Sequence, residues 1–362
     1  MTSRDRWLAA LRFDPVDRLP FWPKLDAAYA PAQESAFREM TVPDIHAFIG
    51  SDRHEWLPSC LREVRSRTSV ETESNGGFRR LTYRTHSGIA TAAHRFDTAS
   101  QSWHPMEFPI KTAPDLRIMT DWFADARCKL DPERLQASRE ACDRLGPDGV
   151  SAETMGTSPL MHLVEWLAGV ENAHLLLAYC RAEVETLFEV MHQSLVERAR
   201  LVSEHSPADL LYMGENTSTT LIAPEQYRRY CVPYIGAYAG IVREHGRTLV
   251  LHMCGHLKAL LPDLSRLDVA GFEAFTSPPV GNATLLDGRS ACPDKCLIGG
   301  TNATLWLRPA REITAQIERH LGELPHHRGI VVTSAGVMPP LSKPETIRDV
   351  CDWVKSYPLR QD

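Results

Sequence analysis

The chain has 362 residues, an apolar fraction of 43%, a charged fraction of 24% and a net charge of −6, values typical of a water-soluble globular protein. This acidic balance, with scattered basic residues, argues against nucleic acid or an anionic membrane as a partner. No apolar run approaches the ~20 residues that a membrane-spanning helix needs, and residues 1–7 lack a signal-peptide-like segment, so we expect a cytoplasmic protein. Nine dispersed cysteines indicate reduced thiols rather than disulfides.

Short apolar segments alternate with amphipathic segments along most of the chain. Strands are predicted at residues 19–22, 53–58, 150–156, 209–213, 247–252, 269–273, 296–300 and 329–333. Helices are predicted at about residues 182–205, 224–245, 257–264 and 344–354. Residues 77–111 contain alternating polar and apolar stretches, which predict a β-rich insertion or lid.

This rhythm predicts the fold class. Repeated strand–helix units indicate a parallel sheet covered by helices, and about eight of them fit a (β/α)8 TIM barrel. We therefore expect one domain over residues 1–362, with an N-terminal extension and the β-rich insertion. A doubly wound open sheet is the alternative, but no predicted strand is followed by a Gly-rich dinucleotide fingerprint.

His252 and Cys254 stand two residues apart at the end of a predicted buried strand. Because side chains alternate along a strand, both should point to the same side. An imidazole nitrogen and a thiolate that converge in this way are suitable ligands for zinc. The alternative is a buried cysteine beside a histidine that is merely hydrogen-bonded.

Polar residues also follow the neighbouring strands. Glu215 and Asn216 follow one strand, and Glu273 lies in the strand after His252. In a barrel these strand ends meet at the catalytic face, so we expect Glu215 and Asn216 to be catalytic and Glu273 to be a further zinc ligand. An open coordination position would make such a site catalytic rather than structural. Glu215 and Asn216 are equally compatible with a surface loop, and Glu273 with a solvent-facing carboxylate.

Several large apolar side chains also fall near predicted strand ends. We expect a partly apolar substrate pocket to be formed by Trp22, Tyr29, Met155, Phe275 and Met338. Most of these residues could equally belong to the core.

A series of motifs in chain order resembles the uroporphyrinogen decarboxylase superfamily and, within it, the zinc-dependent corrinoid methyltransferases. The likeness extends along nearly the whole chain. The motifs that carry it are residues 6–11 (RWLAAL), 17–22 (DRLPFW), 215–219 (ENTST), 224–227 (PEQY), 232–234 (VPY), 252–257 (HMCGHL), 271–276 (GFEAFT), 278–281 (PPVG), 298–301 (IGGT) and 339–340 (PP). The resemblance implies a TIM barrel with the metal motif at residues 252–257.

The chain departs from the superfamily's pattern in two places. The decarboxylases carry an Arg-Gln-Ala-Gly-Arg-Tyr segment that binds propionates, whereas residues 22–29 here contain no arginine. A substrate with many carboxylates needs cationic partners, so porphyrinogen decarboxylation is disfavoured. Methyltransferases that act on coenzyme M carry a further zinc cysteine after the last strand, but residues 333–339 contain none.

The resemblance and its departures together imply a function. We expect zinc-dependent transfer of a methyl group from a small methylated donor, most plausibly a methoxyaromatic ether, to the cob(I)alamin of a separate corrinoid protein. Zinc would polarise the ether oxygen, Glu215 would orient the substrate or assist with the proton, and Asn216 would hydrogen-bond the substrate. A homodimer fits the resemblance. The alternatives are a decarboxylase-like lyase, a methylcobamide:thiol or folate methyltransferase, and a non-catalytic tetrapyrrole- or corrinoid-binding protein.

Overall fold

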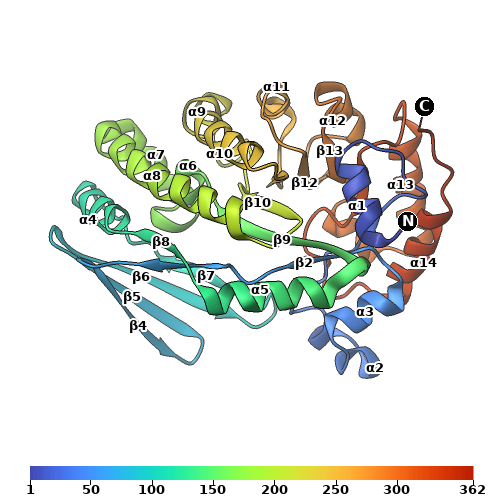
Figure 1. Cartoon of the computed structure of the whole chain (residues 1–362), viewed down its shortest axis with the longest axis horizontal. Coiled ribbons are helices and arrows are strands. Elements are labelled where there is room, and N and C mark those ends of the chain that lie inside the picture. Colours follow the sequence, from blue (N-terminus) through green and yellow to red (C-terminus); the bar gives the residue numbers. More distant parts are fainter. Residues whose placement is uncertain (362) are drawn as a thin grey trace.

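The computed structural model of the chain describes residues 1–361 and contains a barrel of eight parallel strands (Figure 1). The hydrogen-bonded order is β1-β14-β13-β12-β11-β10-β9-β2. These strands are β1 (Phe21–Trp22), β2 (Arg53–Trp56), β9 (Gly149–Gly156), β10 (Leu210–Gly214), β11 (Leu249–His252), β12 (Gly271–Phe275), β13 (Cys296–Gly299) and β14 (Ile330–Thr333). The arrangement confirms the predicted TIM barrel.

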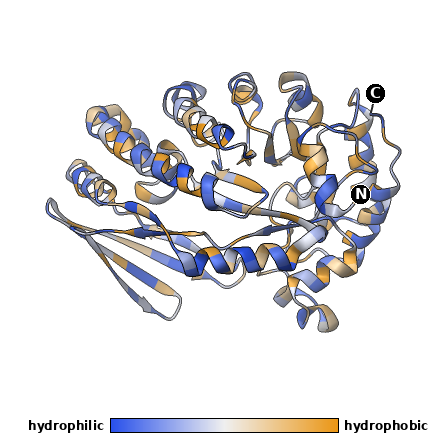
Figure 2. Ribbon diagram, in the orientation of Figure 1, coloured by the Kyte–Doolittle hydropathy of each residue, from blue (hydrophilic) through white to orange (hydrophobic). Residues whose placement is uncertain are grey.

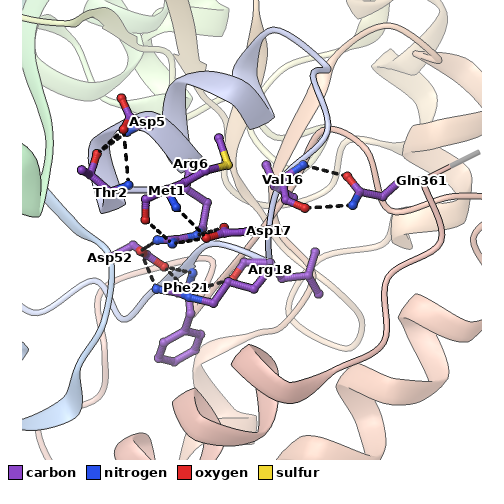
Figure 3. A network of polar contacts seen from close by, with 11 residues as sticks. Met1, Thr2, Asp5, Arg6, Val16, Asp17, Arg18, Phe21, Asp52 and Gln361 are labelled. Atoms are coloured by element: carbon purple, nitrogen blue, oxygen red, sulfur yellow. Dashed lines mark hydrogen bonds and ion pairs between the residues drawn. The ribbon is translucent and has the colours of Figure 1, made fainter.

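The barrel is closed between β1 and β2 by Asp52, the residue that precedes β2 (Figure 3). The Asp52 amide donates to the Phe21 carbonyl at 2.8 Å, and the Phe21 amide donates to Oδ2 of Asp52 at 2.9 Å. Arg6 and Arg18 donate to the same carboxylate at 2.6–2.9 Å, and Arg6 also binds Asp17. Ion pairs from two arginines thus fasten the seam at the N-terminal end of the barrel.

Helices cover the outside of the barrel, and most carry hydrophobic and hydrophilic residues along the same ribbon (Figure 2). The longer ones are α1 (Ser3–Leu11), α3 (Val42–Ile49), α4 (Ala113–Ala124), α5 (Pro132–Leu145), α7 (Val170–Tyr179), α8 (Arg181–His205), α10 (Val232–Glu244), α13 (Ala310–Gly322) and α14 (Pro344–Ser356). The short ones are α2 (Ser35–Arg38), α6 (Pro159–His162), α9 (Pro224–Tyr230), α11 (Leu261–Leu264) and α12 (Leu285–Ala291). Among the described residues, none of the helices is long and apolar enough to cross a membrane.

An antiparallel region projects from the barrel on the side of β2 and β9 (Figure 1). A four-stranded sheet consists of β4 (Ser69–Asn75), β5 (Phe78–Thr85), β6 (Gly88–Asp97) and β7 (Ser102–Glu107), and a smaller one pairs β3 (Leu61–Val64) with β8 (Arg127–Leu130). This confirms the predicted β-rich insertion. The insertion begins earlier than the predicted residue 77, because it includes β4. The prediction missed β4 because this strand is polar and exposed throughout and so lacks the alternation that marks a half-buried strand.

The barrel strands other than β2 bury most residues on both faces, which explains their apolar runs. One cluster fills the barrel interior and includes Val150, Tyr212, Val250 and Ile298, with Trp7 of α1 packed at its end. The other cluster lies between the strands and the helices. Successive residues therefore alternate between the barrel interior and the outer layer.

Two predicted helices were too long. The segment 224–245 is divided into α9 and α10, since Pro233 stands in the first turn of α10 and cannot continue the hydrogen-bond ladder of a preceding helix. The segment 257–264 contains only a 3-10 turn, Lys258–Leu260, and the four-residue helix α11.

Candidate active site

His252 ends β11 and lies level with the ends of the two neighbouring strands. It stands opposite Gly214 of β10 on one side and opposite Glu273 of β12 on the other. Cys254 follows two residues later, in the loop after β11. Both residues are half-buried. The polar end of the barrel is thus the C-terminal end, where TIM-barrel chemistry takes place.

Lys24, which follows β1, reaches across the barrel to this level. Its Nζ donates to both carboxylate oxygens of Glu273, at 3.0 and 3.2 Å, and lies 3.5 Å from Nδ1 of His252. Glu273 also binds Nδ1 of His252. Burial favours the neutral form of Glu273, but Lys24 and His252 outweigh it and lower the pKa of this carboxyl. Burial disfavours imidazolium at His252, yet Glu273 and Cys254 raise its pKa to about 9.

Asn216 connects Cys254 to a carboxylate that the sequence analysis did not select. The Asn216 Oδ1 accepts from Sγ of Cys254 at 3.5 Å, and Nδ2 donates to Oε2 of Glu165 at 3.0 Å. Glu165 lies in a π-helical turn, Leu163–Leu167, and its other oxygen is buried without a hydrogen-bond partner within residues 1–361. Burial raises the pKa of Glu165 to about 7, against the opposing effects of Asn216 and His252.

Glu215 precedes Asn216, but its carboxylate binds Ser158 rather than Glu165 or Cys254. It is fully buried and accepts hydrogen bonds from the amide and the hydroxyl of Ser158, at 2.8 and 2.6 Å. Burial raises the pKa of Glu215 to about 7, although the Ser158 hydrogen bonds favour the carboxylate. Glu215 therefore anchors the start of α6, and its predicted catalytic role stays a prediction.

The five apolar residues expected near the substrate lie in two regions. Trp22 is in the barrel interior, where its ring stacks on His54 at 4.3 Å. The other four, Tyr29, Met155, Phe275 and Met338, pack in the outer layer between strands and helices. Phe275 turns outward after a register shift at Ala274, whose φ is +62°. Their predicted place in a substrate pocket stays a prediction.

Several buried polar atoms in the barrel lack a hydrogen-bond partner among the described residues. They are both ring nitrogens of His54, the hydroxyl of Tyr212 and the hydroxyl of Thr333. Burial lowers the pKa of His54 to about 4, so its ring is neutral. Such orphaned groups cost free energy unless water or a ligand meets them. The charge of Glu273 acts on both His54 and Tyr212.

Lys24, Glu165 and His54 were missed as site residues. Lys24 could have been selected from the sequence, because it follows a short predicted strand and a lysine at a barrel strand end is expected at the catalytic face. Glu165 had none, since nothing in residues 159–167 indicates a π-helical turn facing Asn216.

The donor types at this site suit zinc, because His252 and Cys254 offer nitrogen and sulfur from one strand end. Within residues 1–361, however, no three His, Cys, Asp or Glu side chains surround one point closely enough to hold a metal ion. Both oxygens of Glu273 are bound by Lys24. The zinc ligands therefore stay a prediction, and Lys24 is the group that a metal ion would have to displace from Glu273.

Comparison with known proteins agrees with this architecture. The family model described as uroporphyrinogen decarboxylase (URO-D) matches residues 129–357, well over half of the chain. The chain belongs to the URO-D family. The matched region contains β9 to β14 and the site residues Glu165, Asn216, His252, Cys254 and Glu273, but not Lys24 or His54. The predicted resemblance to the superfamily is thereby confirmed.

A solved structure shares the fold of this URO-D family member. A methyltransferase from Methanosarcina mazei superposes with a TM-score of 0.60 at 15% identity, over 98% of each chain. A B12-independent methionine synthase from a Shewanella species, in complex with selenomethionine, has a TM-score of 0.49 at 8% identity, over 86% of this chain and 85% of the other. No curated protein sequence is significantly similar to the chain.

Proposed function

We propose that this URO-D family member is a methyltransferase that moves a methyl group from a small methylated donor to the cob(I)alamin of a corrinoid protein. The donor is proposed to be a methoxyaromatic ether, so that the reaction is an O-demethylation. The observation that carries the proposal is the meeting of His252, Cys254 and Asn216 at the C-terminal end of the barrel. An imidazole, a thiol and an amide at one point form a site for a polarised small molecule rather than for a large anion.

The charge of the site supports this choice over decarboxylation of a porphyrinogen. The cations at the site are Lys24 and the protonated His252, and Glu273 pairs with both of them. No arginine contacts His252, Cys254, Asn216 or Glu273 within the part of the chain that the structure describes. A substrate with several carboxylates would bring charges that this site cannot pair, which is costly in a buried environment.

The side chains can be assigned roles in the proposed reaction. Asn216 presents an amide at the level of Cys254 and can orient a donor through a hydrogen bond. The Lys24–Glu273 pair fixes the His252 ring through Nδ1. Glu215 holds Ser158 at the start of α6 and so positions the neighbouring π-helical turn. A zinc ion held by His252 and Cys254, with Glu273 as a third ligand, would supply Lewis-acid polarisation of the ether oxygen.

The surface around the barrel mouth supports a protein partner. Large apolar side chains are exposed at the end of β2 and in the loops that follow β12, β13 and β14. They are Trp56, Val280, Leu307, Val337 and Leu341. Exposed apolar groups collected at one end of a molecule are typical of an interaction surface. We propose that the corrinoid protein docks on this end and brings its planar cofactor to the mouth of the barrel.

The experiment combines metal content with methyl transfer. The full chain is incubated with a reduced corrinoid protein and a panel of methoxyaromatic ethers while the cob(I)alamin absorption band is followed. We expect the band to disappear with wild type and the Cys180→Ala control, because Cys180 is half-buried at the end of α7, and to persist with Cys254→Ala. Zinc content after dialysis against a weak chelator should fall only in Cys254→Ala.

Other outcomes would replace the proposal. Decarboxylation of uroporphyrinogen would assign the chain to the lyases, and methylation of a thiol or folate without ether cleavage would assign it to the second half-reaction. Equal zinc in wild type and Cys254→Ala would reject Cys254 as a ligand.

A further inference from the structure

A cavity of about 440 Å³ lies outside the barrel, between the antiparallel insertion and the segment that follows β9. One wall is formed by β4, β5 and β6, and the other by α4, α6 and the π-helical turn Leu163–Leu167, with further residues from β3 and the segment after it. Small-molecule sites are typically clefts of roughly 300–1,000 Å³, so the volume suits one small ligand. The proposed function gives this cavity no role.

Aromatic rings from three elements line the cavity: Tyr83 of β5, Trp122 of α4 and Trp166 of the π-helical turn. Tyr83 and Trp122 meet edge to face, with their ring centroids 5.0 Å apart. Trp166 is 41% exposed, although tryptophan side chains are buried for the most part. A flat ring in the cavity would cover Trp166 and gain the stacked or edge-to-face contacts that aromatic pairs favour. The walls therefore favour a planar aromatic ligand.

His162 of α6 also lines the cavity and is a polar side chain without a hydrogen-bond partner. Its ring meets that of Phe123 edge to face at 5.7 Å, and no hydrogen bond within residues 1–361 reaches either ring nitrogen. Burial lowers the pKa of His162 to about 4, so the ring is neutral and offers one donor and one acceptor. A hydroxyl group offers both as well and therefore matches this imidazole.

The charge of the lining favours a neutral ligand. Arg65 is the one arginine or lysine among the lining residues, and it pairs with Glu63, the one carboxylate. Burial lowers the pKa of His94, which favours its neutral form. Arg79, on the same sheet, stacks on Trp103 instead of lining the cavity. A ligand carboxylate would meet Glu63 and find no unpaired cation in the lining, which is costly in a partly buried site.

We propose that this cavity is a binding site for a small neutral phenol, whose ring lies among Tyr83, Trp122 and Trp166 and whose hydroxyl group hydrogen-bonds to His162. The inference goes beyond the proposed function, because binding here requires neither a metal ion nor a corrinoid protein. Phenols are also the products of the proposed ether cleavage, but their binding in this cavity is independent of that reaction.

The test is isothermal titration calorimetry of the full chain with 4-methylphenol, without added metal or corrinoid protein. We expect one molecule to bind per chain. The ether 4-methylanisole keeps the ring but cannot donate a hydrogen bond, so its affinity should be about tenfold lower. The anion 4-methylbenzoate should not bind measurably, because the lining offers it no unpaired cation. No binding of the phenol, or equal or tighter binding of either analogue, would overturn the proposal.

Trp166→Ala tests the aromatic wall. Because Trp166 is partly exposed, the variant should fold, and its affinity for 4-methylphenol should fall about tenfold through the lost ring contacts. Phe78→Ala is the matched control, since Phe78 is an exposed aromatic residue on the face of β5 opposite to Tyr83. Unchanged affinity in Trp166→Ala, or an equal loss in Phe78→Ala, would contradict the assigned site.

His162→Phe keeps an aromatic ring but removes both ring nitrogens. Its affinity for 4-methylphenol should fall about tenfold, to that of 4-methylanisole, while its affinity for 4-methylanisole should not change. His86→Phe, in the exposed turn between β5 and β6, should bind as wild type. A His162→Phe variant that still prefers the phenol would reject the hydrogen bond. Should this variant not fold, the analogues on wild type and the Trp166→Ala pair still decide the proposal.

Cys254→Ala separates this cavity from the barrel mouth. Its affinity for 4-methylphenol should equal that of wild type, because Cys254 lies in the loop after β11 and does not line the cavity. A loss of affinity would place the ligand at the barrel mouth and overturn the proposal. Phenol binding in a protein without methyl transfer would keep this site and reject the proposed reaction, whereas methyl transfer without phenol binding would do the reverse.

Discussion

Buried carboxylates occupy both ends of this barrel, but their partners differ. At the N-terminal end, Asp52 accepts from Arg6, Arg18 and the Phe21 amide, so both of its oxygens are paired (Figure 3). At the C-terminal end, Glu273 is paired with a lysine and a histidine. Arginine stays charged at all ordinary pH values, whereas lysine and histidine can lose protons or be displaced.

The two ends also differ in how completely their buried polar groups are hydrogen-bonded. The Asp52 seam joins β1 to β2 and leaves neither oxygen of its carboxylate without a partner. Near Glu273, the described residues include unpaired polar atoms on His54, Tyr212, Thr333 and Glu165. One end thus has fixed charges that hold the barrel together, and the other has exchangeable charges that tolerate a ligand. This division agrees with TIM barrels generally, where stability resides at the N-terminal face and chemistry at the C-terminal face.

The largest effect expected from this comparison is on folding. Asp52→Asn leaves the buried Arg6 and the half-buried Arg18 with one carboxylate fewer, and breaking such a pair costs about 3–5 kcal/mol. We expect a fall of that size in the free energy of unfolding, measured from the denaturant midpoint. Asp14→Asn is the matched control, because its pair with Arg12 is exposed and should contribute less than about 1 kcal/mol. Equal stability of the two variants would show that the seam is not held by charge.

The sequence predicted the barrel because each central strand is a short apolar run buried on both faces. It also predicted that His252, Cys254 and Asn216 follow adjacent strands, and the structure brings these three together. Glu215 turned out to bind Ser158, since β10 ends at Gly214 and strand alternation does not extend to Glu215 and Asn216. Alternation within β9 places Met155 in the outer layer.

The partners of the site residues could not be predicted. Lys24 meets Glu273 across 249 positions of sequence, and that contact exists only because the barrel closes β1 against β14. Glu165 reaches Asn216 through an irregular turn that hydrophobic periodicity does not reveal. A single sequence therefore does not predict two features of the site: the contacts that form when the barrel closes, and the side chains that irregular turns put in place.

Glu215 is a third buried carboxylate to compare with Asp52 and Glu273. Both of its hydrogen-bond donors are neutral groups of Ser158. Its pKa is raised to about 7, so the folded chain keeps a proton that the unfolded chain releases above its ordinary value of 4.5. Stability should therefore fall as pH rises from about 4.5 to 7 and stay low above that range. The loss amounts to at most about 3 kcal/mol for a shift of this size.

Glu215→Gln should remove that fall, so the variant should gain stability relative to wild type as pH rises. The measurement is the free energy of unfolding at a series of pH values from 4.5 to 8, with the exposed Glu225→Gln as control. Parallel curves for wild type and Glu215→Gln would mean that Glu215 is not buried as a neutral acid, and the contrast with Asp52 would be lost.

The smallest effect is on metal binding, and it tests whether the pair at Glu273 is exchangeable. In the metal-free chain, Lys24 binds both oxygens of Glu273 and would compete with a cation for them. Lys24→Gln removes this competitor, so the affinity for zinc should rise by about tenfold, or about 1.4 kcal/mol, the scale on which neighbouring groups tune metal sites. Lys258→Gln is the control, because that lysine pairs with Asp287 at the surface. Zinc affinity is read from competition with a chromophoric chelator. Unchanged or weaker binding in Lys24→Gln would exclude Glu273 as a ligand, and Glu273 would then serve, as Asp52 does, to fix neighbouring groups in place.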